Sequence, residues 1–229
     1  TILYVRADPV TLRPCRVFRH RLGDDPSRDA LVYEEGDEAF RCFVCATRSG
    51  RWILIHSYAA DAEEVRLLDA AAPDGQPVVV CPRASCAYEV DDDGTRILIL
   101  TDRDAPTFRV VEADSAAAPP EAWRPVVAAA PGYFIEQAAG FRDYLALIER
   151  GEGRQRVRIV DRADGASHEI RFPEPVEHLW VDANPDPASR LLRLGGTSLV
   201  TPVSYYDYDM SARDLRLVQR ERIPGYDPA

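Results

Sequence analysis

Residues 97–100 read Ile-Leu-Ile-Leu, an aliphatic run that follows the turn residues Asp93-Gly94. Similar runs recur along the chain at Ile2-Leu-Tyr-Val5, Trp52-Ile-Leu-Ile55, Tyr144-Leu-Ala-Leu-Ile148 and Leu191-Leu-Arg-Leu194. The first residues of these five runs lie 45 to 50 positions apart. Self-similarity at a fixed long period indicates a repeat architecture.

Three further series of short apolar or aromatic runs keep nearly the same period. One comprises Val17–His20, Val65–Leu68, Phe108–Val111, Val157–Val160 and Tyr205–Tyr208. Another comprises Leu31–Tyr33, Val78–Val80, Trp123–Val127, His168–Phe172 and Leu215–Val218. The third comprises Phe40–Ala46, Cys86–Val90, Phe134–Ala138 and His178–Val181. Turn residues such as Ser49-Gly50 and Asp164-Gly165 separate the series.

Four strands recurring at this period are typical of the blades of a β-propeller. The sequence therefore predicts an all-β propeller of four-stranded antiparallel blades. We expect full blades at residues 38–84, 85–131, 132–175 and 176–224, with a partial blade at 1–37. An arc of this kind leaves the faces of its two end blades uncovered, so we also expect the chain to self-associate through them.

The 229-residue chain carries a formal charge of −10, and all 28 of its basic residues are Arg. An acidic surface argues against nucleic-acid binding, which needs a positive field, and is compatible with cationic ligands. The longest apolar runs are too short to cross a bilayer, so no membrane partner is expected. The chain opens on Thr1 with no leader, which indicates a part of a longer, cytoplasmic protein.

The five cysteines lie at positions 15, 42, 45, 81 and 86, an odd number that does not suit a secreted disulfide framework. Cys42 and Cys45 have CxxC spacing, but positions three apart on a strand face opposite sides and cannot readily share a metal. Asp91-Asp-Asp93-Gly94 fails the calcium-loop pattern and is better explained as a hairpin turn. We expect no metal and no cofactor.

Catalytic machinery for acyl transfer is not expected either. The chain holds no G-x-S-x-G motif, and Gly195-Gly-Thr-Ser198, the nearest approach to one, falls within a predicted strand. Four histidines, at positions 20, 56, 168 and 178, fall on four different strands. We therefore assign no catalytic residue.

Several local motifs resemble the oligopeptidase B branch of the prolyl oligopeptidase family. They occur in that family's order and spacing, and they cover almost the whole chain: Tyr4–Pro14 with Val17–Gly23, Leu31–Glu35, Glu64–Asp69, Ser198–Pro202 with Tyr206–Met210, and Ile223–Tyr226. The chain departs from the pattern at Phe18, where Trp is usual, at Gly196, where an aromatic residue is common, and at residues 61–63. These departures affect packing and loops.

The resemblance implies a seven-bladed propeller that caps an α/β-hydrolase domain carrying Ser, Asp and His. It implies that the propeller admits short peptides, that the parent serine endopeptidase cleaves after Arg or Lys, and that the triad and principal specificity residues lie outside this chain. Residues 225–229 would begin the link to the peptidase domain. The partners implied are that domain and short basic peptides.

The first strand of each blade lines the central tunnel of a propeller. Our candidates for tunnel-lining positions are Arg41, Phe43, Tyr88, Glu89, Glu136, Gln137, Trp180 and Asp182. A stand-alone propeller that acts as an interaction scaffold is the alternative function. It would need a full set of blades and a closure strand, which this sequence does not show.

Overall fold

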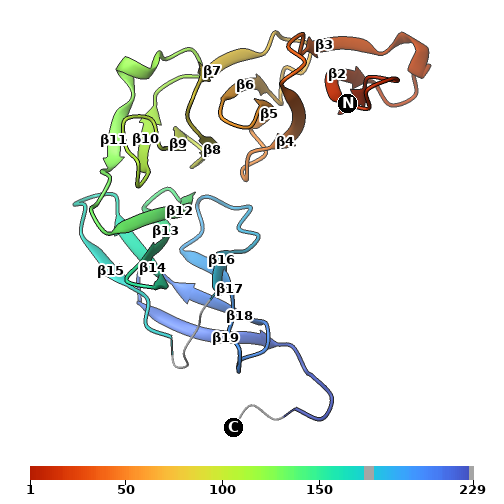
Figure 1. The fold of residues 1–229 in the computed structure, drawn as a ribbon. Helices are drawn as coiled ribbons and strands as arrows, with labels where there is room; N and C mark the ends of the chain where they lie inside the picture. Colours follow the sequence, from red (N-terminus) through yellow and green to blue (C-terminus); the bar gives the residue numbers. More distant parts are fainter. Residues whose placement is uncertain (173–177, 227–229) are drawn as a thin grey trace.

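The chain folds into five antiparallel sheets, as shown by a computed structural model that describes residues 1–172 and 178–226 (Figure 1). The first sheet has three strands, β1 (Ile2–Ala7), β2 (Pro14–His20) and β3 (Ala30–Glu34). Each of the other four sheets has four strands, paired in sequence order. The predicted all-β propeller of four-stranded antiparallel blades is confirmed.

The bounds of the remaining strands follow the sequence period. The second sheet contains β4 (Arg41–Ala46), β5 (Trp52–Tyr58), β6 (Glu63–Asp69) and β7 (Val78–Ala84). The third contains β8 (Tyr88–Asp92), β9 (Ile97–Thr101), β10 (Arg109–Ala113) and β11 (Arg124–Val127). The fourth contains β12 (Tyr133–Gly140), β13 (Tyr144–Gly151), β14 (Arg154–Asp161) and β15 (Ser167–Glu169). The fifth contains β16 (His178–Val181), β17 (Leu191–Thr197), β18 (Ser204–Asp209) and β19 (Asp214–Arg220).

Helical structure among the described residues is limited to two short 3₁₀ turns, η1 (Pro26–Arg28) and η2 (Pro120–Ala122). Neither is long enough to cross a membrane. The blade boundaries proposed from the sequence at 175/176 and the link proposed at 225–229 fall partly on residues 173–177 and 227–229, which lie outside the described part of the chain.

The five sheets follow one another around an arc, with β4, β8, β12 and β16 on its inner side (Figure 1). Because the strands of each sheet are antiparallel, their connections alternate between two faces of the arc. We call the inner hairpins, residues 47–51, 93–96, 141–143 and 182–190, the hairpin face. The exit face comprises residues 8–13, 59–62, 102–108 and 198–203, together with residues 221–226, where the chain leaves the last sheet.

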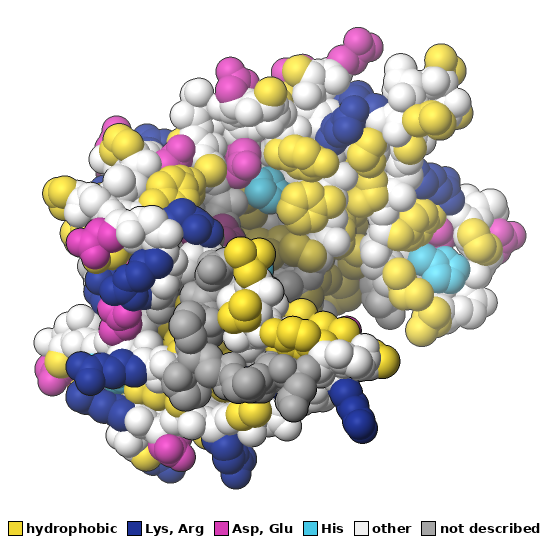
Figure 2. All heavy atoms as spheres, turned by 60° about the horizontal axis from the view of Figure 1, so that its bottom comes forward, with side chains coloured by type: hydrophobic (Ala, Val, Ile, Leu, Met, Phe, Trp, Pro, Cys, Tyr) yellow, Lys and Arg dark blue, Asp and Glu magenta, His cyan; other side chains and the backbone are white. Residues whose placement is uncertain are grey.

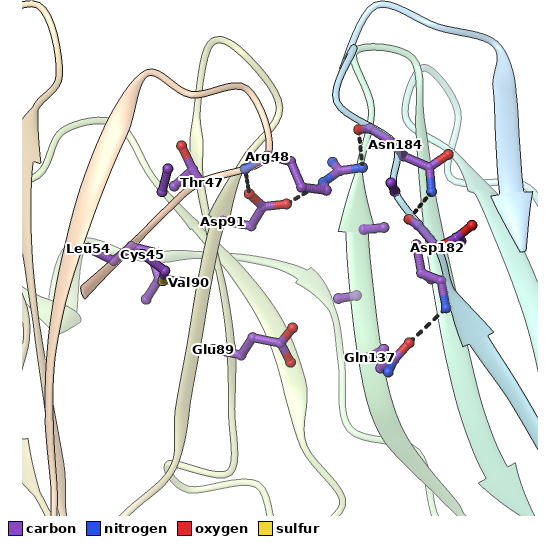
Figure 3. Close-up of a pocket in the computed structure, with 15 residues that line it drawn as sticks. Cys45, Thr47, Arg48, Leu54, Glu89, Val90, Asp91, Gln137, Asp182 and Asn184 are labelled. Carbon is purple, nitrogen blue, oxygen red and sulfur yellow. Dashed lines mark hydrogen bonds and ion pairs between the residues drawn. The ribbon is translucent and has the colours of Figure 1, made fainter. Parts of the chain in front are cut away.

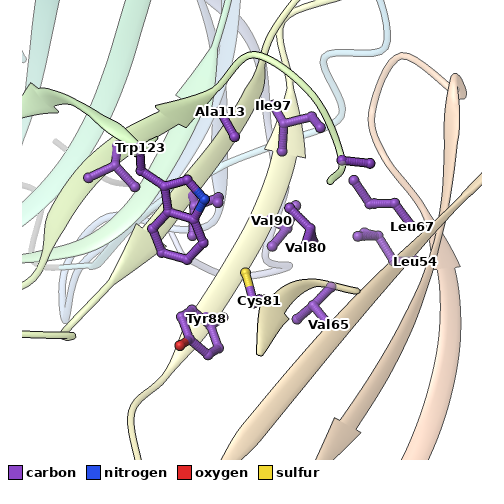
Figure 4. Close-up of a cluster of buried hydrophobic side chains, with 13 residues drawn as sticks. Leu54, Val65, Leu67, Val80, Cys81, Tyr88, Val90, Ile97, Ala113 and Trp123 are labelled. Atoms are coloured by element: carbon purple, nitrogen blue, oxygen red, sulfur yellow. The ribbon is translucent and has the colours of Figure 1, made fainter. Parts of the chain in front are cut away.

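The apolar core is divided among the interfaces between successive sheets. The second and third sheets share a cluster that includes Leu54, Val65, Tyr88, Ile99 and Trp123, all buried (Figure 4). Similar clusters join the third sheet to the fourth and the fourth to the fifth. Each fully buried aliphatic side chain stabilises the fold by about 1.5–3 kcal/mol. The sheets are therefore held together mainly by the flat apolar faces that the sequence repeats supply.

The interface between the third and fourth sheets also contains a buried ionic cluster. The Arg162 guanidinium lies 2.8 Å from a carboxylate oxygen of Asp93 and 2.8 Å from one of Glu112. The side chains of Arg162 and Asp93 are only 6% and 1% exposed. Arg96 reaches the same two carboxylates at 3.2 Å each. We call these four residues the Arg162 cluster. It links the β8–β9 hairpin to the end of β14.

Candidate functional site

A cavity of about 500 Å³ lies on the inner side of the arc and receives residues from four successive sheets (Figure 3). Its polar and charged lining comprises Thr47 and Arg48 after β4, Glu89 and Asp91 on β8, Gln137 on β12, and Asp182 and Asn184 after β16. The cavity therefore occupies the position where a propeller has its central tunnel.

Strand alternation explains why two carboxylates of β8 share this cavity. Glu89 and Asp91 lie two positions apart and so face the same side of the strand. Val90, between them, is 8% exposed and packs into the core shared by the second and third sheets. Period-two patterning thus directs acidic groups toward the axis and the apolar group into the sheet interface.

The environment of Glu89 raises its pKa to about 7. The main cause is desolvation, because the cavity walls surround the carboxylate even though the side chain remains accessible to solvent. Repulsion by Asp91 adds to the increase in pKa. Glu89 is thus poised to change charge near neutral pH.

Two side-chain amides fix the loop after β16 beside the cavity: Gln137 connects the fourth sheet to the fifth, and Asn184 bonds within the fifth sheet. The Gln137 side-chain carbonyl accepts a hydrogen bond from the Val181 backbone N–H at 2.9 Å. The Asn184 amide donates to the backbone carbonyls of Asp182 and Arg193, at 2.6 and 3.0 Å. Its carbonyl accepts from the Arg193 N–H at 2.7 Å. These bonds hold the loop after β16 in place beside the cavity.

Of the eight tunnel-lining candidates proposed from the sequence, Glu89, Gln137 and Asp182 line this cavity. Arg41 and Phe43 are exposed at the beginning of β4. The Phe43 ring lies tilted against His56 and edge-on to Tyr58 of β5, at centroid distances of 4.8 and 5.8 Å. Arg41 and Phe43 lie toward the beginning of β4, whereas Cys45, near its end, lines the cavity.

The other three candidates, Tyr88, Glu136 and Trp180, do not line the cavity. Tyr88 is 3% exposed and packs edge-on against Trp123 in the core. Glu136 forms an ion pair with Arg150 on the neighbouring strand. Trp180 lies over Gly195 and edge-on to Tyr205. The alternation of side chains along a strand separates the residues of its two faces. It does not say which face borders the cavity.

Arg48 and Asn184, which follow β4 and β16, also line the cavity, as does Asp91 near the end of β8, and none of the three was expected from the sequence. Their contacts join segments that are far apart in sequence, such as Arg48 and Asn184, 136 positions apart. A strand pattern gives no signal for such loop contacts. The turn chemistry of Ser49-Gly50 and Asp93-Gly94 locates the hairpins but not their partners.

The described residues do not form an arrangement suited to acyl transfer. The Ser198 hydroxyl accepts hydrogen bonds from the Val200 and Thr201 N–H groups of its own loop. Among the histidines, His20 pairs with Asp29 at 2.8 Å and His56 with Glu63 at 3.1 Å, neither beside Ser198. No group of three or more potential metal ligands is found within the described ranges.

The cysteines are free thiols. Cys42 is buried and Cys45 is exposed, as expected for positions three apart on β4. Desolvation and the nearby Cys15 raise the pKa of Cys42 to about 11, which makes it a weak nucleophile at neutral pH.

Comparison with known proteins gives matches along nearly the whole chain. Residues 1–221 match the sequence profile of the prolyl oligopeptidase N-terminal β-propeller domain. A dipeptidyl aminopeptidase BI from Pseudoxanthomonas mexicana is 32% identical over 99% of this chain and 31% of its own length. Protease 2 from Moraxella lacunata is 26% identical over 94% of this chain and 31% of its own.

Solved structures give the same result. Oligopeptidase B from Trypanosoma brucei, in a closed form with covalently bound antipain, superposes with a TM-score of 0.85 and 27% identity. The match covers 99% of this chain and 34% of that protein. Oligopeptidase B from Leishmania major gives a TM-score of 0.85 at 26% identity, covering 99% and 33%. The chain thus spans about a third of the length of these relatives.

Proposed function

The chain belongs to the prolyl oligopeptidase family, as part of its N-terminal β-propeller domain, and we propose that it is the non-catalytic, substrate-gating part of a longer serine peptidase. The observation that carries the proposal is the cavity lined by four successive inner strands, in a chain with no catalytic arrangement among its described residues. A propeller around such an opening can limit the size of what passes through it.

We propose short peptides cleaved after Arg or Lys as the substrates of the parent enzyme. The formal charge of −10 and the carboxylates of Glu89, Asp91 and Asp182 at the cavity support a preference for cationic peptides. The likeness to oligopeptidase B structures at 26–27% identity supports an endopeptidase. In the parent, the partner of this chain would be the α/β-hydrolase domain.

One relative gives specific support to a second mode of cleavage. The dipeptidyl aminopeptidase BI, at 32% identity, has a name that indicates removal of dipeptides from a free amino terminus. The two modes separate on peptides that differ only in whether the amino terminus is blocked. An endopeptidase tolerates the block, whereas a dipeptidyl aminopeptidase does not.

A stand-alone scaffold is the alternative of a different class. The match to only about a third of the length of its relatives favours a part of a larger protein over a self-contained propeller. We further propose a cytoplasmic location, which the five free thiols support.

The proposal is tested by assaying the 229-residue chain and the full-length protein with a fluorogenic peptide that has Arg before the cleaved bond. We expect turnover by the full-length protein, blocked by a serine-directed phosphonate, and none by the chain alone. Turnover by the repurified chain, or a full-length protein inert on blocked and free peptides alike, would contradict it.

A further inference from the structure

Arg48, in the hairpin between β4 and β5, makes contacts with three other sheets across the inner side of the arc. Its backbone N–H and its Nε donate to the two carboxylate oxygens of Asp91, at 2.9 and 2.6 Å. One terminal guanidinium nitrogen donates to the Gly140 carbonyl at the end of β12, and the other to the Asn184 carbonyl at 3.4 Å. Figure 3 shows the side chain extending from its hairpin toward Asn184.

The surroundings hold this guanidinium in one place. Its side chain is 19% exposed, and that of Asp91 is 16% exposed. The guanidinium carbon lies 4.9 Å from the centre of the Phe141 ring, at the distance of a cation–π contact. A partly buried charge that has a carboxylate, two carbonyls and an aromatic face as partners is costly to displace.

The neighbouring hairpin residues extend the same connection. The Ser49 hydroxyl donates to Asp92 at 2.7 Å, and Arg51 donates to the Gly94 carbonyl at 3.4 Å. These bonds join the second sheet to the third. Only the Arg48 side chain, within this described hairpin, has hydrogen bonds that reach the fourth and fifth sheets.

We propose that Arg48 closes the axial cavity at the hairpin face and so limits the size of the peptide that passes through it. The inference rests on the proposed gating function and names the residue that performs it. The planar guanidinium can donate in several fixed directions at once, to acceptors on three sheets, which a lysine ammonium on a flexible stem does not reproduce. A peptide that passes through the cavity must displace the hydrogen bonds of the Arg48 guanidinium, whereas a small molecule need not.

The test compares wild-type, Arg48→Ala, Arg48→Lys and Arg51→Ala forms of the full-length protein. Two fluorogenic substrates carry the same cleavage site, one in a tripeptide and one in a β-hairpin peptide. We expect R48A to raise the ratio of kcat/KM for the hairpin peptide over the tripeptide about tenfold, equivalent to about 1.4 kcal/mol. R48K should give an intermediate ratio, and R51A, from the same hairpin, should match wild type.

A second measurement needs no activity. Cys45 lines the cavity and is a free, exposed thiol. Its rate of labelling by a polyethylene-glycol maleimide, divided by that with N-ethylmaleimide, should rise about tenfold in R48A, in parallel with the kinetic ratio. Mass spectrometry assigns the labelled cysteine, and Cys45→Ser gives the background.

The two measurements test the peptidase function and the role of Arg48 separately. If wild type hydrolyses no peptide, the proposed peptidase function fails, and Cys45 labelling still decides the role of Arg48. If R48A leaves the labelling ratio unchanged, or changes it no more than R51A does, Arg48 does not close the cavity. A kinetic ratio that stays constant in an active enzyme also overturns the inference.

Discussion

Charged side chains hold neighbouring sheets together at the hairpin face, whereas large apolar side chains lie exposed at the exit face. The hairpin face carries the Arg48–Asp91 ion pair and, within the Arg162 cluster, the Arg162–Asp93 ion pair. The exit face carries Val10, Leu12, Leu199, Val200, Ile223 and Tyr226, which are 43–92% exposed. Figure 2 shows hydrophobic side chains gathered around the hollowed centre of the arc.

The difference indicates what each face does. The charged side chains of the hairpin face form ion pairs with one another within the chain. The hairpin face therefore needs no covering partner. We expect the exit face to contact another surface, because several exposed apolar residues gather there. The Tyr226 hydroxyl donates to the Val200 carbonyl at 2.5 Å, which fixes the departing chain against the exit face. A family in which a propeller precedes a catalytic domain suits this division.

The largest expected effect is on the buried ionic contact. Asp93→Asn should lower the free energy of unfolding of the chain by about 3–5 kcal/mol, because it leaves the buried Arg162 guanidinium with one carboxylate fewer. Urea unfolding measures the change. Glu34→Gln, which breaks the exposed Arg16–Glu34 pair, is the control and should cost far less, because solvent screens this pair. A similar loss of unfolding free energy in both variants would mean that burial does not determine how much these ion pairs stabilise the chain.

The next effect concerns close packing at the end of β12. A Cβ on Gly140 would lie 1.9 Å from a Leu98 methyl carbon, so Gly140→Ala should destabilise the chain by about 1–3 kcal/mol through overpacking. Gly36 has no neighbouring atom within 4 Å of a built Cβ and serves as the control. Thermal unfolding of the two alanine variants distinguishes them. A neutral Gly140→Ala would show that the inner hairpins pack loosely.

A pH-dependent effect follows from Glu89. Its pKa of about 7 exceeds its usual value of 4.5, so the folded state binds more protons than the unfolded state between these values. Stability from this group is therefore lost as pH rises from about 4.5 to about 7. Glu89→Gln removes the titration, so its Tm minus that of wild type should increase from pH 5 to pH 8.

Glu121→Gln, an exposed carboxylate away from the cavity, controls for the loss of one negative charge. If the Tm difference for Glu89→Gln is constant across this range, or follows that of Glu121→Gln, the cavity walls do not desolvate Glu89.

The smallest effect is expected at the exit face. Leu199 is 92% exposed, so Leu199→Ser should change the free energy of unfolding by no more than about 0.5 kcal/mol. It should nevertheless reduce self-association of the isolated chain, because it removes exposed apolar area. Sedimentation at several concentrations measures this. If Leu199→Ser leaves self-association unchanged, the chains associate through the uncovered faces of the end blades instead.

The sequence was most informative about the sheets. Aliphatic runs such as Ile97–Leu100 and Leu191–Leu194 lie within β9 and β17, because strand burial imposes a pattern that the residues must satisfy. The same pattern placed Glu89 on an inner strand. It could not identify Arg48 or Asn184, whose contacts depend on how separate hairpins meet in space. The same pattern predicted that both Tyr88 and Glu89 line the tunnel. In the structure Tyr88 is buried in a sheet interface, and only Glu89 faces the cavity.

We propose that this propeller limits what the parent peptidase can cleave. The most direct measurement is the rate of cleavage per Arg site by the full-length protein, for a short peptide and for an unfolded protein chain containing the same sites. We expect rapid cleavage of the peptide and little cleavage of the long chain, because the proposed gate would exclude the long chain. Equal rates per site on the two substrates would contradict it.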